Sequence, residues 1–210
     1  VGTERDVIMP DTIEGYPVND KVNWDTFHFG ALSRAEVRFY KLLDLSELTY
    51  TTSTDGISIT AYSGNVTGTG YDNVAIPGTI NGKPVVELGD KVFQGRDFAA
   101  IYLPEQLKII GSETFDACKN LQHVVFPDTL VDIGNYAFYG CSLDGEEIVL
   151  PEGLTDMGMG VFYYCTPKSV YLPSTLSSVG DGFMAGCGGE YIVSPEHELI
   201  RSTDGIIISQ

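Results

Sequence analysis

The chain is built on one repeated phrase, which is clearest in Leu103-Pro104-Glu105-Gln106-Leu107-Lys108-Ile109-Ile110-Gly111-Ser112-Glu113-Thr114-Phe115-Asp116-Ala117-Cys118. Five versions follow one another from about Asn73 to the C-terminus. Their prolines are Pro77, Pro104, Pro127, Pro151 and Pro173, so the spacing is 27, 23, 24 and 22 residues. A period in the twenties is typical of a solenoid, in which each repeat buries its apolar face only against its neighbours.

Each repeat opens with a short segment of alternating side chains, which predicts a strand. These strands are expected at 101–103, 124–126, 148–150 and 170–172. The residues expected to point into the core are Ile101, Leu103, Val124, Phe126, Ile148, Leu150, Val170 and Leu172. The proline that follows has no N–H, so it ends the strand and turns the chain.

A glycine and a phenylalanine mark the far side of each repeat. Gly111, Gly134, Gly158 and Gly180 each follow an apolar residue. We expect either a positive φ or a close approach to the next coil at these glycines. Phe115, Phe138 and Phe162 come four residues later, whereas Phe183 comes three residues later. We expect the first three rings to stack in the centre of the solenoid, with burial contributing about 1.5–3 kcal/mol per ring.

The phrase L-P-x-x-L-x-x-I-G-x-x-x-F-x-x-C, taken from Leu103 to Cys118, resembles the BspA-like leucine-rich repeat of bacterial surface proteins. The lead-in from Asn73 to Val85 resembles the first repeat of that family, in which an I-P-x-x-I-x-G-x-P-V insertion lengthens the turn. The resemblance covers roughly residues 46–210, and it departs from the family at Gly95-Arg96, where the first repeat would have its cysteine. It implies a right-handed, β-rich leucine-rich repeat solenoid of stacked, short parallel strands.

Four cysteines occupy one equivalent position, three or four residues after the phenylalanine: Cys118, Cys141, Cys165 and Cys187. Equivalent positions stack in a solenoid, so we expect a ladder of reduced, buried thiols. One or two disulfides between adjacent coils are the alternative, since an exported protein lies in an oxidising environment. A zinc site is not expected, because the chain has no C-x-x-C pair with a nearby histidine.

Both ends of the repeat array carry a hairpin signal. The tetrapeptide Ser-Thr-Asp-Gly occurs at 53–56 and again at 202–205, each time between β-rich segments. Asp-Gly in that setting predicts a β-hairpin. We therefore expect hairpin caps near 46–62 and 191–208, at the two ends of a solenoid that spans 46–210.

Residues 1–45 are expected to form a separate N-terminal segment. The stretch Ile8–Val18 nearly duplicates the lead-in that begins at Ile76, which indicates a degenerate repeat. Ser33 and Glu36 match a capping box ahead of apolar residues with helical spacing, so a short helix is expected over about 34–45. The alternative is a strand at Glu36–Tyr40 that completes a full repeat.

The charge of the chain restricts its partners. The formal net charge is −17, and from Asn120 onward the only basic residues are Lys168 and Arg201, against twelve acidic ones. Such a surface repels nucleic acid and anionic membranes, so neither is expected as a partner. No run approaches the roughly 18 apolar residues that a membrane span needs, so membrane insertion is not expected either.

No catalytic constellation is visible in the sequence. The three histidines, His28, His123 and His197, lie far apart and have no nucleophile or metal-spaced partner. We therefore expect neither an enzyme nor a bound cofactor or metal. One acidic cluster comprises Asp144, Glu146, Glu147, Glu152 and Asp156. Its carboxylates could hold Ca²⁺, but their spacing matches no fixed loop, so a solvated acidic edge is the favoured interpretation.

The strand residues that alternate away from the core form the candidate binding face: Ala100, Tyr102, His123, Val125, Glu147, Val149, Ser169 and Tyr171. Tyrosine is enriched at recognition surfaces, so Tyr102, His123 and Tyr171 are the leading contacts. Plain β propensity is the other explanation for exposed valine and tyrosine.

Together with the family resemblance, this face predicts a secreted or cell-surface, extracellular bacterial protein. Its expected role is that of an adhesion scaffold for host, extracellular-matrix or other cell-surface proteins. Two alternatives stay open. One is a carbohydrate-binding module, in which tyrosine rings stack on sugars, and the other is a structural spacer within a larger surface protein.

Overall fold

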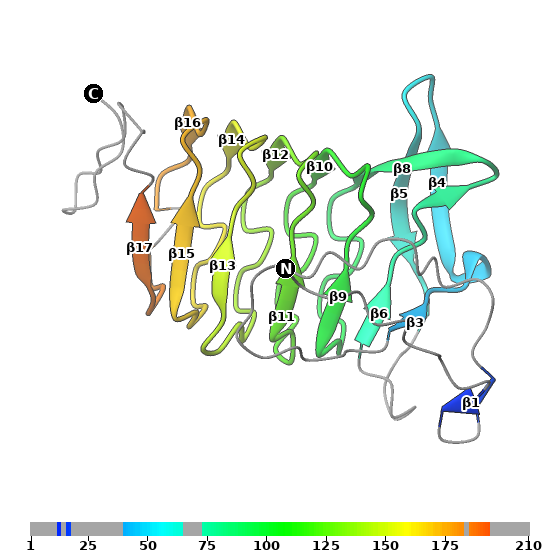
Figure 1. Cartoon of the computed structure of the whole chain (residues 1–210), viewed down its shortest axis with the longest axis horizontal. Helices are drawn as coiled ribbons and strands as arrows, with labels where there is room; N and C mark the ends of the chain where they lie inside the picture. The colour runs from blue at the N-terminus through cyan, green and yellow to red at the C-terminus, as the bar shows by residue number, and fades with distance from the viewer. Residues whose placement is uncertain (1–11, 14–15, 18–39, 65–72, 183–184, 194–210) are drawn as a thin grey trace, which may run out of the picture. The chain divides into compact units, whose positions relative to one another are not determined.

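The structure is a computed structural model that describes residues 12–13, 16–17, 40–64, 73–182 and 185–193 (Figure 1). The chain divides into two compact units, residues 1–37 and residues 38–210. The described part of the first unit is one antiparallel pair, β1 (Thr12–Ile13) with β2 (Tyr16–Pro17). The lead-in near Ile76 forms the same kind of pair, β7 (Thr79–Ile80) with the start of β8 (Lys83–Leu88). The near-duplication read from the sequence therefore holds for this turn.

Two rows of short strands run along the unit that spans residues 38–210 (Figure 1). The first row is one sheet of β4 (Leu48–Thr52), β5 (Ile57–Tyr62), β8, β10 (Ile109–Ile110), β12 (Asp132–Ile133), β14 (Asp156–Met157) and β16 (Ser178–Val179), with β7 beside β8. The second row begins with a sheet of β3 (Lys41–Leu42), β6 (Asn73–Ala75), β9 (Ala100–Tyr102) and β11 (His123–Val125). It continues with a sheet of β13 (Glu147–Val149), β15 (Ser169–Leu172) and β17 (Glu190–Val193).

Each repeat contributes one strand to each row, as the pairing of β9 and β10 with their neighbours illustrates. β9 pairs in parallel with β6 and β11, and β10 pairs in parallel with β8 and β12. Pro104 lies between β9 and β10, because its missing N–H ends the first strand. The predicted inward residues are buried, except that Val124 is half-buried. The β-rich solenoid of stacked parallel strands is thus confirmed.

A column of stacked phenylalanine rings fills the centre of the coils. The Phe115 and Phe138 ring centroids lie 5.0 Å apart with an interplanar angle of 18°, and those of Phe138 and Phe162 lie 5.7 Å apart at 21°. Phe93 extends the column, 5.5 Å from Phe115 at 7°. All four rings are fully buried. The predicted column is confirmed and is one coil longer than expected.

The repeated glycines allow adjacent coils to approach closely. A Cβ built on Gly134 would lie 2.6 Å from Ser112 N and 2.7 Å from Gly111 C, closer than real Cβ atoms come to the backbone. Gly158 meets the backbone of Asn135 in the same way. Neither glycine has a positive φ. Of the two expectations for this position, the close approach is therefore correct and the positive φ is wrong.

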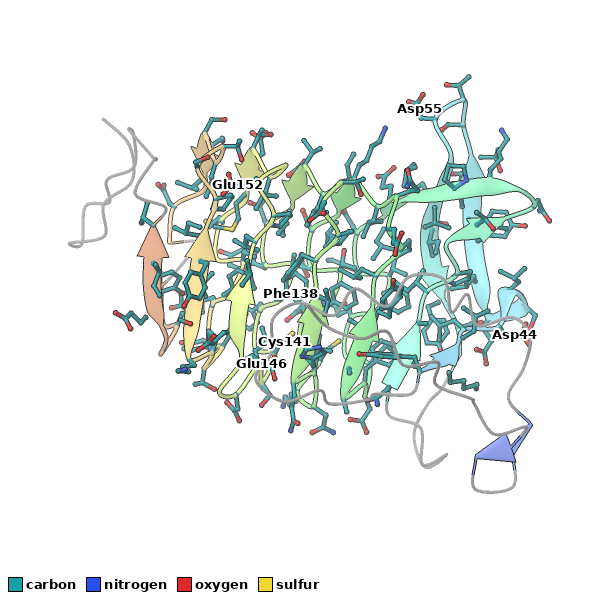
Figure 2. All side chains as sticks on the ribbon, in the orientation of Figure 1. Asp44, Asp55, Phe138, Cys141, Glu146 and Glu152 are labelled. Atoms are coloured by element: carbon teal, nitrogen blue, oxygen red, sulfur yellow. The ribbon has the colours of Figure 1, made fainter. Side chains whose placement is uncertain are left out.

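The cysteines follow the same stacking. Three donate their thiol to the carbonyl oxygen of a phenylalanine in the preceding coil: Cys118 to Phe93 at 3.1 Å, Cys141 to Phe115 at 3.1 Å and Cys165 to Phe138 at 3.0 Å. Figure 2 shows Phe138 and Cys141 inside the coil. All four cysteines are free thiols, but Cys187 is partly exposed rather than buried. The ladder is confirmed for the first three members.

The front of the solenoid contains the expected hairpin, since β4 and β5 pair antiparallel around Ser53–Gly56. The predicted helix over 34–45 is wrong where the structure describes it. Residues 41–42 form β3, which pairs in parallel with β6, and a 3₁₀ turn follows at Leu45–Glu47. The sheet hydrogen bonds offered by β6 override the helical spacing of the apolar residues. Of the alternative strand at 36–40 only Tyr40 is described, and it is not in a strand. Of the back hairpin predicted at 191–208 only residues 191–193 are described, as the end of β17, and the rest lies outside the described residues.

Candidate functional site

The second row of strands presents one column of apolar side chains on its outer side. The register aligns Ala75, Tyr102 and Val125 on one sheet, and Val149, Tyr171 and Ile192 on the other. Val125 is 52% exposed and Val149 is 63% exposed, whereas Tyr102 and Tyr171 are half-buried. We call Tyr102, Val125, Val149 and Tyr171 the strand face. Neighbouring strands lie about 4.8 Å apart, so its members within each sheet are in lateral contact.

The second outward column was predicted only in part. It contains Ala100, His123, Glu147 and Ser169. Ala100 is 1% exposed and Ser169 is 4% exposed, so both belong to the interior and the prediction of Ser169 as a contact residue is wrong. Ser169 lies on the middle strand of its sheet, between Glu147 and Glu190 in the register, and its hydroxyl is buried.

His123 and Glu146 connect the two sheets of the second row. His123 Nδ1 lies 2.8 Å from Glu146 Oε2, and the two side chains are only 20% and 28% exposed. No ladder pairs β11 with β13 at this point. The loop before β13 turns through positive φ values at Leu143 (47°) and Gly145 (72°), which displaces the chain from regular pairing. His123 is thus engaged in holding the face together, so we do not count it as a ligand contact.

Two polar side chains at the strand face also have partners. The Tyr102 hydroxyl donates to Glu105 Oε1 at 3.2 Å, and its ring contacts Tyr40 with centroids 6.0 Å apart. Glu147 forms an ion pair with Lys168 at an exposed position, where such a pair contributes about 0–1 kcal/mol. The face is therefore an apolar strip with a polar border.

The acidic cluster read from the sequence does not converge on one point. Asp144 accepts from Thr166, Glu146 contacts His123, Glu147 pairs with Lys168, Glu152 accepts from Ser174, and Asp156 accepts from Thr155. Figure 2 shows Glu146 and Glu152 well apart on the coil. Within the described residues no three potential metal ligands come together. Four of these carboxylates bind a side chain of a neighbouring coil and Asp156 binds the adjacent Thr155, so the arrangement supports the interpretation as an acidic edge.

The buried thiols have low reactivity at neutral pH. Burial raises the pKa of Cys118 and of Cys165 to about 12, and it raises the pKa of Cys141 well above the ordinary value. The thiolate is the reactive form of cysteine, so these three side chains lack nucleophilic character at neutral pH. The ladder is a packing feature.

One aromatic cluster was not predicted from the sequence. Tyr136, Tyr139, Tyr163 and Tyr164 gather on the turns that follow β12 and β14, outside both rows of strands. The sequence contained a signal for this cluster, because Tyr139 and Tyr163 directly follow the stacked Phe138 and Phe162. Equivalent positions of adjacent repeats must stack, so these two rings were bound to meet.

Among the described residues, no helix is long and apolar enough to span a bilayer. The polypeptide matches the description "BspA type Leucine rich repeat region", with six copies over residues 86–202. No curated protein matches.

Solved structures show the same fold. The leucine-rich repeat protein of T. pallidum is 31% identical, with a TM-score of 0.60, over 69% of this chain and 66% of that chain. The pneumococcal vaccine antigen PcpA is 18% identical, with a TM-score of 0.58, over 83% of this chain and 55% of that chain. The chain thus spans about two thirds of the first protein and about half of the second. The repeat phrase, the stacked coils and the match over residues 86–202 place the chain in the BspA-type leucine-rich repeat family.

Proposed function

We propose that this chain is a secreted or cell-surface bacterial scaffold that binds other proteins through the strand face and has no catalytic role. The single observation that carries the proposal is the apolar strip itself. Val125 and Val149 are more than half exposed, and each is the register partner of a tyrosine on the neighbouring strand of its own sheet. Exposed apolar groups that gather on one face with a polar border are typical of protein-interaction sites.

The architecture suits docking of a large partner. Parallel pairing and the fully buried phenylalanine column hold the strands in fixed register. A rigid surface loses little conformational freedom on binding, so a modest number of side-chain contacts can give a stable complex. The location outside the cell is supported by the kind of protein that shares the fold, since PcpA is described as a vaccine antigen.

A binding experiment with two matched variants tests the proposal. Purified chain is passed over immobilised extracellular-matrix proteins and over a glycan array, as wild type, Val149→Glu and Val131→Glu. Both valines are exposed, at 63% and 40%, so neither change disturbs the core. Val131 directly precedes β12 in the first row, away from the strand face. Both variants add the same single negative charge.

We expect Val149→Glu to weaken capture of a matrix protein about tenfold or more, because a buried carboxylate at an apolar contact is costly. Val131→Glu should bind like the wild type. Equal binding by both variants would show that the strand face is not the binding surface. A signal confined to the glycan array would favour the carbohydrate-binding alternative, and no binding to either would favour a spacer.

A further inference from the structure

Four tyrosines form a compact surface on the turns between the two rows of strands, and we call Tyr136, Tyr139, Tyr163 and Tyr164 the tyrosine patch. The Tyr139 and Tyr163 rings stack with centroids 5.6 Å apart and an interplanar angle of 6°. Tyr163 and Tyr164 meet edge to face at 4.3 Å, and Tyr136 meets Tyr139 edge to face at 5.9 Å. Four rings from two adjacent coils therefore form one continuous aromatic surface.

Tyr164 is the member that packing does not require. Its backbone has a φ of 60°, in the left-handed region that bulky residues rarely adopt, and its side chain is 60% exposed. The equivalent residues of the other coils are small: Gly95, Ala117, Gly140 and Gly186. A large, exposed ring held in a strained conformation, where the repeat elsewhere uses a small residue, points to a function outside the coil.

Two glycines make room for the rings. A Cβ on Gly160 would lie 2.5 Å from Tyr136 Cε1, so the Tyr136 ring rests directly on the backbone of the next coil. A Cβ on Gly186 would lie 3.3 Å from Tyr164 Cδ1. The neighbouring Tyr164 hydroxyl also raises the pKa of Tyr163. The tyrosine rings thus pack against the backbone of the next coil at both glycines.

The coils that carry the patch and their neighbours are strongly acidic. From Asn120 to Val193 the carboxylates are Asp128, Asp132, Asp144, Glu146, Glu147, Glu152, Asp156, Asp181 and Glu190. The same stretch has one basic side chain, Lys168, which already pairs with Glu147. The net charge over this stretch is therefore about 8 negative units, which favours a cationic partner.

Two of these carboxylates line a shallow groove on the same coils. It has a volume of about 400 Å³ and is lined by Asp132, Asp156 and Asn135, among others. Asp132 and Asp156 are direct partners in the register of β12 and β14. Neither has an ion-pair partner within the described part of the chain. Burial, and then the charge of Asp156, raise the pKa of Asp132. Asn135, which lines the groove, immediately precedes Tyr136, so the chain passes directly from the groove to the patch.

From this combination we propose a second binding surface, in which the tyrosine patch and the adjoining acidic groove receive a lysine- or arginine-bearing segment of a partner protein. The faces of tyrosine rings attract cations, and a guanidinium group can both stack on a ring and pair with a carboxylate. The uncompensated negative charge disfavours acidic peptides and nucleic acid. This surface lies on the turns and is separate from the strand face.

The test measures binding of two synthetic peptides by fluorescence anisotropy. One alternates arginine with serine, and the other alternates glutamate with serine. The protein is the full chain as wild type, Tyr164→Gly, Asp132→Asn, Tyr171→Ser and Val149→Glu. Tyr164→Gly removes the exposed ring and gives the left-handed position the residue that other coils have, so folding is retained. Tyr171→Ser is the control on the strand face. A glycan array with the same variants covers the other class of ligand.

We expect the arginine peptide to bind and the glutamate peptide not to bind. Tyr164→Gly should weaken the arginine peptide about threefold to thirtyfold, and Asp132→Asn should weaken it by a smaller factor, as expected for one cation–π contact and one partly screened ion pair. Binding should weaken as salt is raised, and Tyr171→Ser should bind like the wild type. The inference fails if the arginine peptide does not bind at millimolar concentration, if Tyr171→Ser is the variant that abolishes binding, or if Tyr164→Gly affects only glycan capture. If Val149→Glu loses matrix-protein binding but still binds the arginine peptide, the tyrosine patch binds its ligand independently of the strand face.

Discussion

Adding one methyl group at Gly134 should separate two coils of the solenoid. The new Cβ would lie 2.6 Å from Ser112 N, 2.7 Å from Gly111 C and 3.0 Å from Ser112 Cα, all of them backbone atoms. Ordinary contacts of a carbon atom are about 3.5–4.0 Å, so the coils must move apart by about 1 Å. That movement strains the hydrogen bond from Gly134 N to Ile110 O, which is 2.7 Å long.

The magnitude follows from two opposing effects. Overpacking against a rigid neighbour costs about 1–3 kcal/mol, and the upper end applies here because backbone atoms cannot rotate away. Replacing glycine by alanine also restricts the unfolded chain, which returns about 0.4–1 kcal/mol. We therefore expect Gly134→Ala to lower the free energy of unfolding by about 2 kcal/mol. In a urea titration followed by circular dichroism, the midpoint should fall by about 1 M.

Gly78 provides the matched control. A Cβ on Gly78 would meet nothing within 4 Å, and its φ is not positive. Gly78→Ala should leave the midpoint unchanged or raise it slightly. If Gly134→Ala proves as stable as Gly78→Ala, the close packing of coils described above is refuted.

Three further predictions concern the core, the tyrosine patch and the thiols. Phe138→Ala should cost about 4 kcal/mol, because the buried ring stacks on both neighbours; a loss below about 1 kcal/mol by urea denaturation contradicts the column. Tyr164→Gly should stay within about 1 kcal/mol of the wild type in the same assay, because relief of left-handed strain offsets the lost ring contacts. Burial raises the pKa of Cys118 and Cys165 to about 12, against about 9 for an unfolded thiol. Below pH ~9 both states are protonated and stability is unaffected. Between pH ~9 and ~12 only the unfolded state ionises, so the free energy of unfolding should fall by about 1.4 kcal/mol per pH unit for each thiol. Urea midpoints at pH 8, 9 and 10 measure this, and a flat profile across them is the contrary result.

The spacing of equivalent residues was sufficient to predict the architecture. Phe115, Phe138 and Phe162 recur at one phase of the period, and stacked coils must bring such residues together. The same reasoning located Val125 and Val149 on the outer side of the strands. Local signals were less dependable. The capping box at Ser33 favoured a helix, but the pairing of β3 with β6 is a tertiary contact that no local pattern announces.

Two further features could not be predicted from the sequence: which residues of the outer face are buried, and which side chains are exposed on the turns. Ser169 was predicted on the outer side of its strand, yet its side chain is buried, which alternation along a single strand does not indicate. The repeat period placed Tyr139 and Tyr163 at equivalent positions. It did not predict the exposure of their rings, because exposure depends on how the turn projects from the coil. Tyr164 owes its position to a left-handed backbone that only the structure reveals.

The most direct test of in-register stacking is a double-mutant cycle within the phenylalanine column. The free energy of unfolding is measured by urea denaturation for Phe115→Leu, Phe138→Leu and Phe162→Leu, and for the pairs 115/138 and 115/162. Phe115 and Phe138 are in contact at 5.0 Å, whereas Phe138 lies between Phe115 and Phe162. We predict a coupling energy of about 0.5–1.5 kcal/mol for the adjacent pair and about zero for the separated pair. Equal coupling in the two pairs, or none in either, would contradict the stacked solenoid on which the strand face and the tyrosine patch both depend.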